Sequence, residues 1–485
     1  MKNPLQSLQD QGQSVWLDYL RRSLITGGEL KRLIKEDGLR GLTSNPSIFE
    51  KAIAGSTDYR DMLEAPESQG IDAKALYERI AVRDIQDAAD LLRPVYLDSK
   101  RRDGYVSLEV SPRLARETQG TLREARRLWQ TVARENLMIK VPGTPEGIPA
   151  VQQLISEGIN VNVTLLFAQE AYEQVAAAYQ GALESLARRG ADLGKVASVA
   201  SFFISRIDTA VDNCIADLLK DSHNLGEQAR LRSLLGKVAI ASAKSTYQKY
   251  LEILRGDRWQ EISRHGAQTQ RLLWASTGMK NPDYSDVLYV EELIGPETVN
   301  TMPPATLDAF RDHGRVRLTL TENTEEAISI MNLVEQVGIP FKKLTDKLLD
   351  EGVKQFADAF AKLLKATERS GKASDHDPIE FLRVELLNDL YQEQHHSGAR
   401  SMNRSPTFRS SLQPWASSGS RFCPPSAERR PLSACRFVDR TSSCSICQAH
   451  VHNARCPGSP LACCNYFTFL STHRSPRDIA LICLD

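Results

Sequence analysis

The chain has 485 residues, and its 61 Lys and Arg balance 61 Asp and Glu, so the formal net charge is +0 at pH 7. This balance argues against a nucleic-acid-binding or membrane-surface protein. No window approaches about 18 uninterrupted apolar residues, and the first residues lack a basic stretch followed by an apolar one. We therefore expect a cytoplasmic protein with no membrane partner. The 41% hydrophobic content is enough for one large domain or two smaller ones.

Cysteine usage divides the chain into two parts. Cys214 stands alone in the long N-terminal part, whereas all other cysteines lie between Cys423 and Cys483. From about Ser397 the sequence is rich in Ser, Pro, Arg and Cys and contains no lysine. We predict a folded domain over residues 1–372 and a helical linker or fusion remnant over 373–396. For residues 397–485 we predict a non-native or disordered tail that lacks strands and amphipathic helices of useful length.

The N-terminal part alternates short apolar runs with longer amphipathic segments, which is the pattern of parallel βα units. The predicted strands, in chain order, are residues 15–20, 39–44, 105–110, 137–142, 159–167, 196–203, 272–277 and 287–293. About eight such units predict an α/β fold, a (β/α)8 TIM barrel. Between the strands, residues 168–190 predict a helix that stops at Gly190. A doubly wound sheet is the rival, but no phosphate-cradling glycine motif follows any predicted strand.

Polar residues recur at the ends of these predicted strands. In a barrel those ends share one mouth, where the chemistry takes place. Each residue taken singly has a structural explanation, such as a turn, a helix cap or a solvated surface position. Their joint recurrence predicts one shared pocket, and the candidates are Asp18, Thr43, Ser44, Asn45, Glu109, Lys140, Asn162, Thr164, Ser201, Phe203, Arg206 and Lys280.

Lys140 is the most informative candidate, because it sits near the end of the apolar run LMIKVP. Burial removes the hydration of an ammonium and so favours the neutral amine, which is the nucleophile that forms a Schiff base with a carbonyl. The alternative is a lysine that extends out of an edge strand to keep its charge in water.

Three segments resemble the transaldolase family. They are GLTSNPSIF (41–49), LMIKVPGTPEG (137–147) and SFFISR (201–206). The resemblance covers roughly the first 370 residues and fits the long form, which in some proteins is fused to glucose-6-phosphate isomerase. It implies a barrel of the class I aldolase type that uses no metal and no cofactor. The implied reaction transfers a dihydroxyacetone unit between sugar phosphates in the non-oxidative pentose phosphate pathway.

The resemblance also implies roles for individual residues. Lys140 matches the Schiff-base lysine. Glu109 matches the carboxylate that acts through a water held also by Thr164, and Asp18 matches the acid/base at the donor's C4 hydroxyl. The remaining matches are Asn45, Asn162 and Ser201 as sugar ligands, Phe203 as an aromatic wall, and Arg206 as a phosphate ligand; Thr43 and Ser44 join the substrate-binding set.

Lys280 departs from the pattern, because shorter transaldolases have an arginine where this sequence places it. A lysine supplies charge without the forked geometry of a guanidinium, so the phosphate would be held less rigidly. The alternative reading is a loop lysine near the mouth of the barrel.

The sequence is also compatible with two other functions. One is a fructose-6-phosphate aldolase that releases free dihydroxyacetone, and the other is a noncatalytic sugar-phosphate-binding barrel. For the tail we expect an out-of-frame translation or a degraded fusion remnant. The competing hypothesis is a zinc module that contacts nucleic acid. Its ligands would come from Cys444, Cys447, His450, His452 and Cys456.

Overall fold

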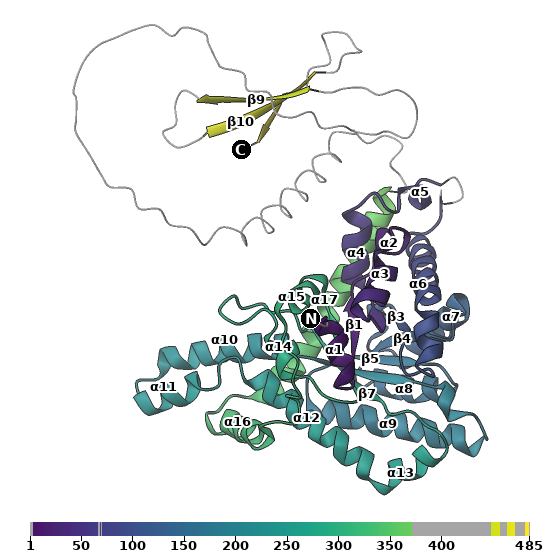
Figure 1. Ribbon diagram of the computed structural model, residues 1–485, viewed down its shortest axis with the longest axis vertical. Helices are drawn as coiled ribbons and strands as arrows, with labels where there is room; N and C mark the ends of the chain where they lie inside the picture. The colour runs from purple at the N-terminus through teal and green to yellow at the C-terminus, as the bar shows by residue number, and fades with distance from the viewer. Residues whose placement is uncertain are drawn as a thin grey trace. The chain divides into compact units, whose positions relative to one another are not determined.

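The computed structural model describes residues 3–65, 68 and 70–370, with side chains up to residue 368, and the backbone of three strands within the tail. In the first part, eight parallel strands close into a barrel in sequence order, and helices surround it (Figure 1). The strands are β1 (Gln13–Asp18), β2 (Gly41–Thr43), β3 (Tyr105–Glu109), β4 (Leu137–Pro142), β5 (Val161–Leu166), β6 (Ser198–Phe203), β7 (Arg271–Ala275) and β8 (Thr298–Met302). The (β/α)8 prediction is confirmed.

The helices follow the strands along the chain and cover the outside of the barrel. They are α1 (Pro4–Asp10), α2 (Arg22–Thr26), α3 (Glu29–Arg32), α4 (Pro46–Ala54), α5 (Arg60–Leu63), α6 (Ala73–Asp98), α7 (Thr118–Val132), α8 (Gly147–Ser156), α9 (Gln169–Arg188), α10 (Ser205–Asp221), α11 (Leu225–Arg232), α12 (Val238–Arg255), α13 (Asp257–Arg264), α14 (Leu288–Glu292), α15 (Pro304–His313), α16 (Thr324–Gln336) and α17 (Phe341–Ser370). The helix predicted over 168–190 is α9, and Gly190 follows it in the left-handed conformation, with φ +67.

The eighth predicted strand is wrong. Residues 287–293 contain the short helix α14, and the barrel closes through β8 at 298–302. Apolar periodicity misses β8 because three of its five residues are polar and bond to neighbouring strands or loops. Gln13 donates to the Thr298 hydroxyl at 3.0 Å, and the Thr277 hydroxyl donates to Asn300 Oδ1 at 3.0 Å.

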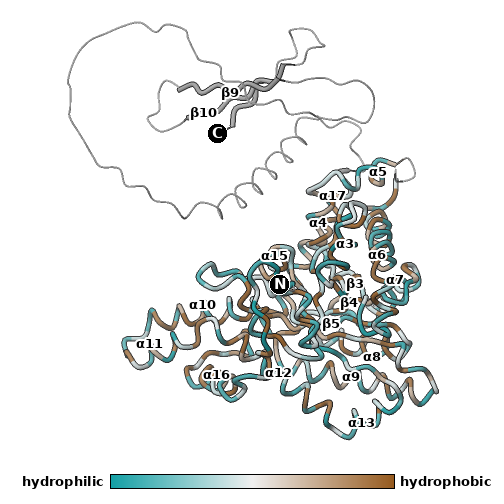
Figure 2. The backbone as a smooth tube through the Cα atoms, in the orientation of Figure 1, coloured by the Kyte–Doolittle hydropathy of each residue, from teal (hydrophilic) through white to brown (hydrophobic). Residues whose placement is uncertain are grey.

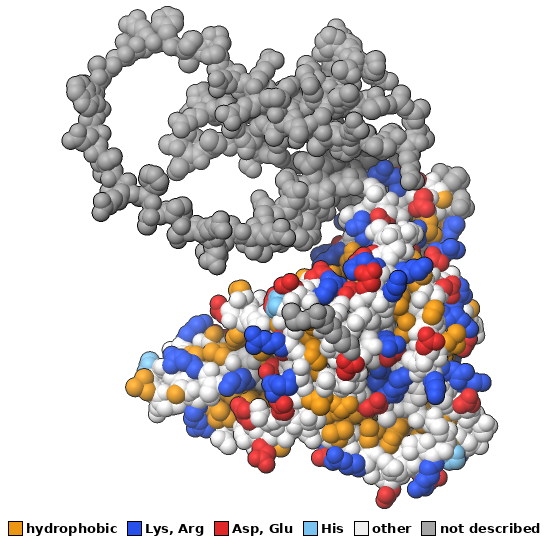
Figure 3. All heavy atoms as spheres, in the orientation of Figure 1, with side chains coloured by type: hydrophobic (Ala, Val, Ile, Leu, Met, Phe, Trp, Pro, Cys, Tyr) orange, Lys and Arg blue, Asp and Glu red, His pale blue; other side chains and the backbone are white. Residues whose placement is uncertain are grey.

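Apolar side chains fill the space between the strands and the surrounding helices. Figure 2 shows hydrophobic and hydrophilic stretches alternating along outer helices such as α9 and α12, as expected for helices with one face on a core. On the face drawn in Figure 3, basic and acidic side chains are interspersed over the barrel, in agreement with the balanced composition. Among the described residues, no helix is both long enough and apolar enough to span a membrane.

A buried ion pair closes the N-terminal end of the barrel. Arg271, at the start of β7, donates to Asp103 at 2.8 Å and to the Ser14 hydroxyl at 2.7 Å. Asp103 also accepts from Ser14 at 2.7 Å and from the Trp16 indole at 3.2 Å. Because both charges are hydrogen-bonded on several sides, we assign this ion pair a structural role at the N-terminal end of the barrel.

Helix α17 is 30 residues long, so it extends about 45 Å at the usual rise per residue. It packs against α4, α6 and α10, and it also contacts β5. A single helix therefore contacts several of the segments that carry predicted site residues.

Within the tail, the described residues form three antiparallel strands in the order β11-β10-β9. They are β9 (Gln448–Arg455), β10 (Cys463–Leu470) and β11 (Leu481–Leu484). The expectation that 397–485 lacks strands does not hold for these segments. The 373–396 linker and Cys444, Cys447 and Cys456 lie outside the described residues, so the zinc hypothesis stays a prediction.

Gly104 offers a test of how the barrel packs on its helices. It has φ +82, and a Cβ there would lie 2.6 Å from Tyr96 Cα in α6. We expect Gly104→Ala to lower the free energy of unfolding by at least about 2 kcal/mol, since backbone strain adds to a clash that forces α6 to move. Urea unfolding measures the change.

Gly158 provides the control, because it has φ +85 and a Cβ at this position would have no atom within 4 Å. Gly158→Ala should cost only the left-handed strain of about 1 kcal/mol. Equal losses at the two positions would contradict the proposed clash with α6.

Candidate active site

A cavity of about 90 Å³ lies at the C-terminal ends of the strands and brings most of the predicted residues together. Its lining consists of Asp18, Thr43, Asn45, Lys140, Thr164, Ser201, Phe203, Arg206, Ala275, Ser276, Thr301 and Phe356. The predicted shared pocket is therefore present. The other four candidates lie outside this lining. Glu109 contacts Lys140, and Lys280 lines a neighbouring cavity. Ser44 and Asn162 lie in the shell of residues around the cavity.

Strand register explains why these side chains meet. Glu109 on β3 is the partner of Lys140 on β4, and Lys140 is in turn the partner of Asn162 on β5. In a second row, Asp18 on β1 is the partner of Thr43 on β2. Residues paired across parallel strands point to the same side of the sheet, so each row presents its polar groups together.

Lys140 is buried, with 4% of its surface exposed. Its Nζ lies 3.5 Å from Glu109 Oε2 and donates to the backbone oxygen of Ser44 at 3.2 Å. The ring of Phe356 from α17 lies 5.8 Å from the same nitrogen. The amine is thus held by few polar partners inside a small cavity, and the alternative of a lysine extending into solvent is wrong.

Glu109 is buried as well, and neither carboxylate oxygen has a hydrogen-bond partner among the described residues. Burial raises the pKa of Glu109 to about 7; Lys140 opposes this shift, and the charge of Asp18 adds to it. Near neutral pH the carboxyl can therefore either give or take a proton, which is what a general acid/base requires.

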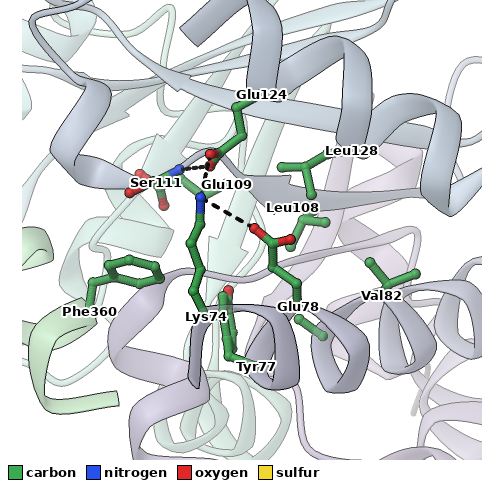
Figure 4. Close-up of a pocket in the computed structure, with 11 residues that line it drawn as sticks. Lys74, Tyr77, Glu78, Val82, Leu108, Glu109, Ser111, Glu124, Leu128 and Phe360 are labelled. Atoms are coloured by element: carbon green, nitrogen blue, oxygen red, sulfur yellow. Dashed lines mark hydrogen bonds and ion pairs between the residues drawn. The ribbon is translucent and has the colours of Figure 1, made fainter. Parts of the chain in front are cut away.

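A separate small cavity adjoins Glu109 between β3, α6 and α7 (Figure 4). Its volume is about 10 Å³, close to the space that one water needs. Its polar rim includes Lys74, which donates to Glu124 at 2.7 Å, and the backbone N–H of Ser111, which donates to the same carboxylate at 2.7 Å. The outer side of Glu109 therefore faces a water-sized space and a charged rim.

Thr164 carries another unsatisfied group. Its hydroxyl is fully buried without a hydrogen-bond partner among the described residues, and it lines the cavity beside Lys140. The strand is irregular here, since the register shifts between Val163 and Leu166 and Leu165 has φ +61. Buried polar atoms normally have partners, so Thr164 and Glu109 are placed to bind a water or a polar group of a substrate.

Asp18 is partly buried at the end of β1 and accepts from the Thr43 hydroxyl at 2.7 Å. Burial raises its pKa, whereas Lys140, the bond from Thr43 and the charge of Arg206 lower it. Thr43 also bonds to the Thr301 hydroxyl at 2.8 Å. Asp18 thus adds a carboxyl on the cavity itself, and its orientation is fixed by a neighbour.

The remaining polar candidates are already engaged with neighbours. Asn162 donates to the Ser107 hydroxyl at 3.1 Å and accepts from Ser201 at 2.7 Å. Asn45 lines the cavity while its side chain caps α4, accepting from the Ile48 N–H at 3.0 Å. Asn45 therefore serves as a helix cap and lines the cavity as well.

Ser44 lies outside the cavity lining. Its hydroxyl donates to the backbone oxygen of Ser107 at 2.7 Å, and its own backbone oxygen receives Lys140. Ser44 therefore positions the lysine in this structure, which differs from the direct substrate contact expected from its place at a strand end.

The mouth of the site is positively charged. Arg206 at the start of α10 has its guanidinium carbon 5.4 Å from the Phe203 ring centre, and it joins the first cavity to a larger one of about 350 Å³. Lys280 lines that second cavity. Burial lowers the pKa of Arg206 against the opposing effects of Asp18 and Glu351, and partial burial together with Arg206 lowers the pKa of Lys280.

Four residues of the lining were not among the candidates: Ala275, Ser276, Thr301 and Phe356. Thr301 lies on β8, which we had placed elsewhere, and Phe356 lies on α17, more than 200 residues after Lys140. The TVNTM segment before a double proline was the available signal for β8. Nothing local marks Phe356 as a site residue, because an aromatic at helical spacing is usually core.

Fold and site together define a class of enzyme: a (β/α)8 barrel with a buried lysine and two carboxyls at the C-terminal ends of its strands. Comparison with known proteins gives the family. The family model described as "Transaldolase/Fructose-6-phosphate aldolase" matches residues 15–367. The chain belongs to this family.

Curated relatives agree with this assignment. A transaldolase of Trichodesmium erythraeum is 48% identical over 372 residues, which are 76% of this chain and 98% of the relative. A transaldolase of Thiobacillus denitrificans is 49% identical over 353 residues, 73% of this chain and 96% of the relative. One of Thermobifida fusca is 44% identical over 365 residues, 75% of this chain and 97% of the relative. The expected likeness to fused isomerase proteins stays an expectation.

The pKa of Glu109 predicts a pH dependence of stability. Its value rises from 4.5 to about 7 on folding, so the neutral carboxyl stabilises the fold fully below about pH 4.5, and this contribution is lost as the pH rises through about 7. Glu109→Gln does not titrate. Its free energy of unfolding should therefore increase relative to that of the unchanged protein between about pH 5 and about pH 8, by up to roughly 3 kcal/mol.

Urea unfolding of both proteins at the two pH values measures this difference. A difference that stays constant, or that shrinks as the pH rises, would show that Glu109 titrates near its ordinary pKa.

Proposed function

We propose that this enzyme transfers a dihydroxyacetone unit from sedoheptulose 7-phosphate to glyceraldehyde 3-phosphate, producing erythrose 4-phosphate and fructose 6-phosphate. The relatives named transaldolase, which match over nearly their whole length, support this reaction. The observation that carries the mechanism is the buried Lys140 amine, 3.5 Å from Glu109 and in one cavity with Asp18.

The first step joins the donor to the enzyme. The neutral Lys140 amine attacks the C2 ketone and forms a carbinolamine. Glu109, whose pKa of about 7 leaves it partly protonated, supplies the proton with which the hydroxyl leaves as water. We assign to Thr164 the water through which this proton moves; the absence of another partner for its hydroxyl among the described residues supports this role. The product is a protonated imine on Lys140.

The second step breaks the carbon–carbon bond. Asp18 takes the proton of the C4 hydroxyl, the C3–C4 bond breaks, and its electron pair moves into the imine to form an enamine. The aldehyde product leaves with the new C4 carbonyl. The protonated imine is the electron sink, so this mechanism calls on no metal or organic cofactor.

The third step reverses these events with a new aldehyde. The enamine carbon attacks the carbonyl carbon of the acceptor and forms a new carbon–carbon bond. Asp18 returns its proton to the oxygen of that carbonyl, which becomes a hydroxyl. Hydrolysis of the resulting imine with the help of Glu109 releases the longer ketose and restores the Lys140 amine. Arg206 and Lys280 hold the acceptor's phosphate at the second cavity.

Transfer rather than release of free dihydroxyacetone depends on the lifetime of the enamine in water. The burial of Lys140 and the small volume of its cavity limit access of bulk water to the intermediate. The family description covers both activities, whereas the three relatives described carry the name transaldolase. We therefore favour the transferase over the aldolase.

Borohydride reduction tests the imine directly. With fructose 6-phosphate present, we expect a three-carbon adduct on the peptide that contains Lys140, detected by mass analysis. Lys244 is the control, because it is similarly buried at 5% exposure but pairs with Glu292 at 3.4 Å outside the cavity. It should remain unmodified, and an adduct on Lys244 or on no lysine would refute the mechanism.

Lys140→Met should lower kcat by at least about 10³-fold, since no other group described in the cavity can form the imine. Circular dichroism and thermal unfolding should show a folded barrel, because methionine matches the lysine stem without its charge. Residual turnover near that of the unchanged enzyme would place the nucleophile elsewhere.

The partition between transfer and release is a separate measurement. With fructose 6-phosphate alone, free dihydroxyacetone should form slowly; adding erythrose 4-phosphate should divert the three-carbon unit into sedoheptulose 7-phosphate. Comparable rates with and without the aldehyde would instead favour the aldolase.

A further inference from the structure

We propose that helix α17 sets the affinity of the enzyme for phosphorylated substrates through Lys347 and Glu351. Lys347 acts as a third cation of the second cavity, beside Arg206 and Lys280. Glu351 acts as an anion of the protein that competes with phosphate for these cations. The inference rests on the proposed function and extends it, because both residues lie on a helix that supplies none of the groups assigned above to phosphate binding.

The placement of the two residues follows from helix geometry. Half of the second cavity's lining comes from one face of α17, whose members are spaced by three or four residues: Leu344, Lys347, Leu348, Glu351 and Gln355. Side chains at this spacing lie on one side of a helix. The rest of the lining includes Arg206 and Lys280. Lys347 and Glu351 therefore face the same space as the two cations assigned to phosphate.

The helix backbone also comes close to Arg206. A Cβ on Gly352 would lie 3.7 Å from Arg206 Nη1 and 2.9 Å from a methyl group of Leu165. A side chain at position 352 would push the helix away from the strand, so glycine permits this approach. The charges on α17 are thereby held near the guanidinium.

The charges of the cavity suit a phosphate monoester. Arg206, Lys280 and Lys347 contribute three positive charges and Glu351 one negative charge, which leaves a net charge of +2. A phosphate monoester carries about −1.5 to −2 near neutral pH. A bound phosphate would therefore nearly neutralise the cavity and relieve the repulsion between Arg206 and Lys280.

Before a substrate binds, Glu351 neutralises part of the positive charge of the second cavity. Its carboxylate lies 3.6 Å from Lys347 Nζ, and its charge acts on Arg206 in the direction that stabilises the guanidinium. An incoming phosphate must share these cations with Glu351. Removing the carboxylate should thus strengthen phosphate binding, whereas removing Lys347 should weaken it.

The competing explanation is an ordinary surface ion pair between residues four apart on a helix, which contributes little. The same helix offers a matched example in Lys354 and Asp358, whose atoms lie 2.6 Å apart and which do not line the cavity. If the proposal is correct, the two pairs behave differently toward phosphate, although both are exposed pairs of identical spacing.

The experiment uses the full chain with Lys347→Met, Glu351→Gln, and the control variants Lys354→Met and Asp358→Asn. At saturating donor, we expect Lys347→Met to raise the KM for glyceraldehyde 3-phosphate and the inhibition constant of inorganic phosphate about two- to fivefold. The effect is modest because the Lys347 side chain is 71% exposed and its charge is screened. Glu351→Gln should shift both constants by a similar factor in the opposite direction.

Unphosphorylated glyceraldehyde as acceptor provides an internal reference. The ratio of kcat/KM for the phosphorylated aldehyde to that for glyceraldehyde should fall in Lys347→Met and rise in Glu351→Gln. The control variants should leave this ratio and the inhibition constant unchanged. Changes of the same sign in both cavity variants, or equal changes in the control pair, would overturn the proposal.

Calorimetric titration of inorganic phosphate separates this proposal from the enzymatic one. If the enzyme fails to turn over sugar phosphates, the proposed function fails, yet the opposite shifts in phosphate affinity still test α17. If turnover is normal and phosphate affinity is the same in all variants, only the role of α17 is refuted.

Discussion

The ion pair between Lys140 and Glu109 is the constraint on which the site depends. The two residues are register partners on neighbouring strands, so closure of the barrel brings their charged ends to 3.5 Å inside a cavity. Few polar groups compensate for their burial, and the carboxylate oxygens have no hydrogen-bond partner among the described residues. The pair is therefore costly for the fold and available for chemistry, since a proton can move without first breaking strong hydrogen bonds.

The opposite end of the barrel shows what a purely structural pair looks like. Arg271 and Asp103 are equally enclosed, but Ser14, Trp16 and a backbone oxygen complete their hydrogen bonds. The same barrel thus contains one buried ion pair, Arg271 with Asp103, that is surrounded by hydrogen-bond partners. In the other, Lys140 with Glu109, the carboxylate oxygens have no such partner among the described residues. This contrast is the structural reason for assigning reactivity to the C-terminal end and stability to the N-terminal end, as is general for this fold.

Helix α17 completes the site from outside the barrel. It places Phe356 against the Lys140 amine and presents a charged face to the cavity that holds Arg206 and Lys280. The groups that we propose to react lie on strands, which fix them rigidly, whereas the groups that we propose to bind phosphate lie on helices and loops at the mouth. This division allows substrate affinity to change without moving the lysine or its two carboxyls.

The sequence by itself determined the barrel, seven of its strands, and the residues at their ends, because apolar runs, turn residues and strand-end polar groups are local properties of the chain. It also determined the family, through the segments around Asn45, Lys140 and Arg206. Only the tertiary structure decided that β8 is the polar TVNTM segment and that the Ser44 hydroxyl bonds to a backbone oxygen outside the cavity lining. It also decided that Phe356 lines the cavity of Lys140 and that Lys347 and Glu351 line the neighbouring one. These features arise from hydrogen bonds and packing between segments far apart in the chain. Local sequence periodicity carries no information about such contacts.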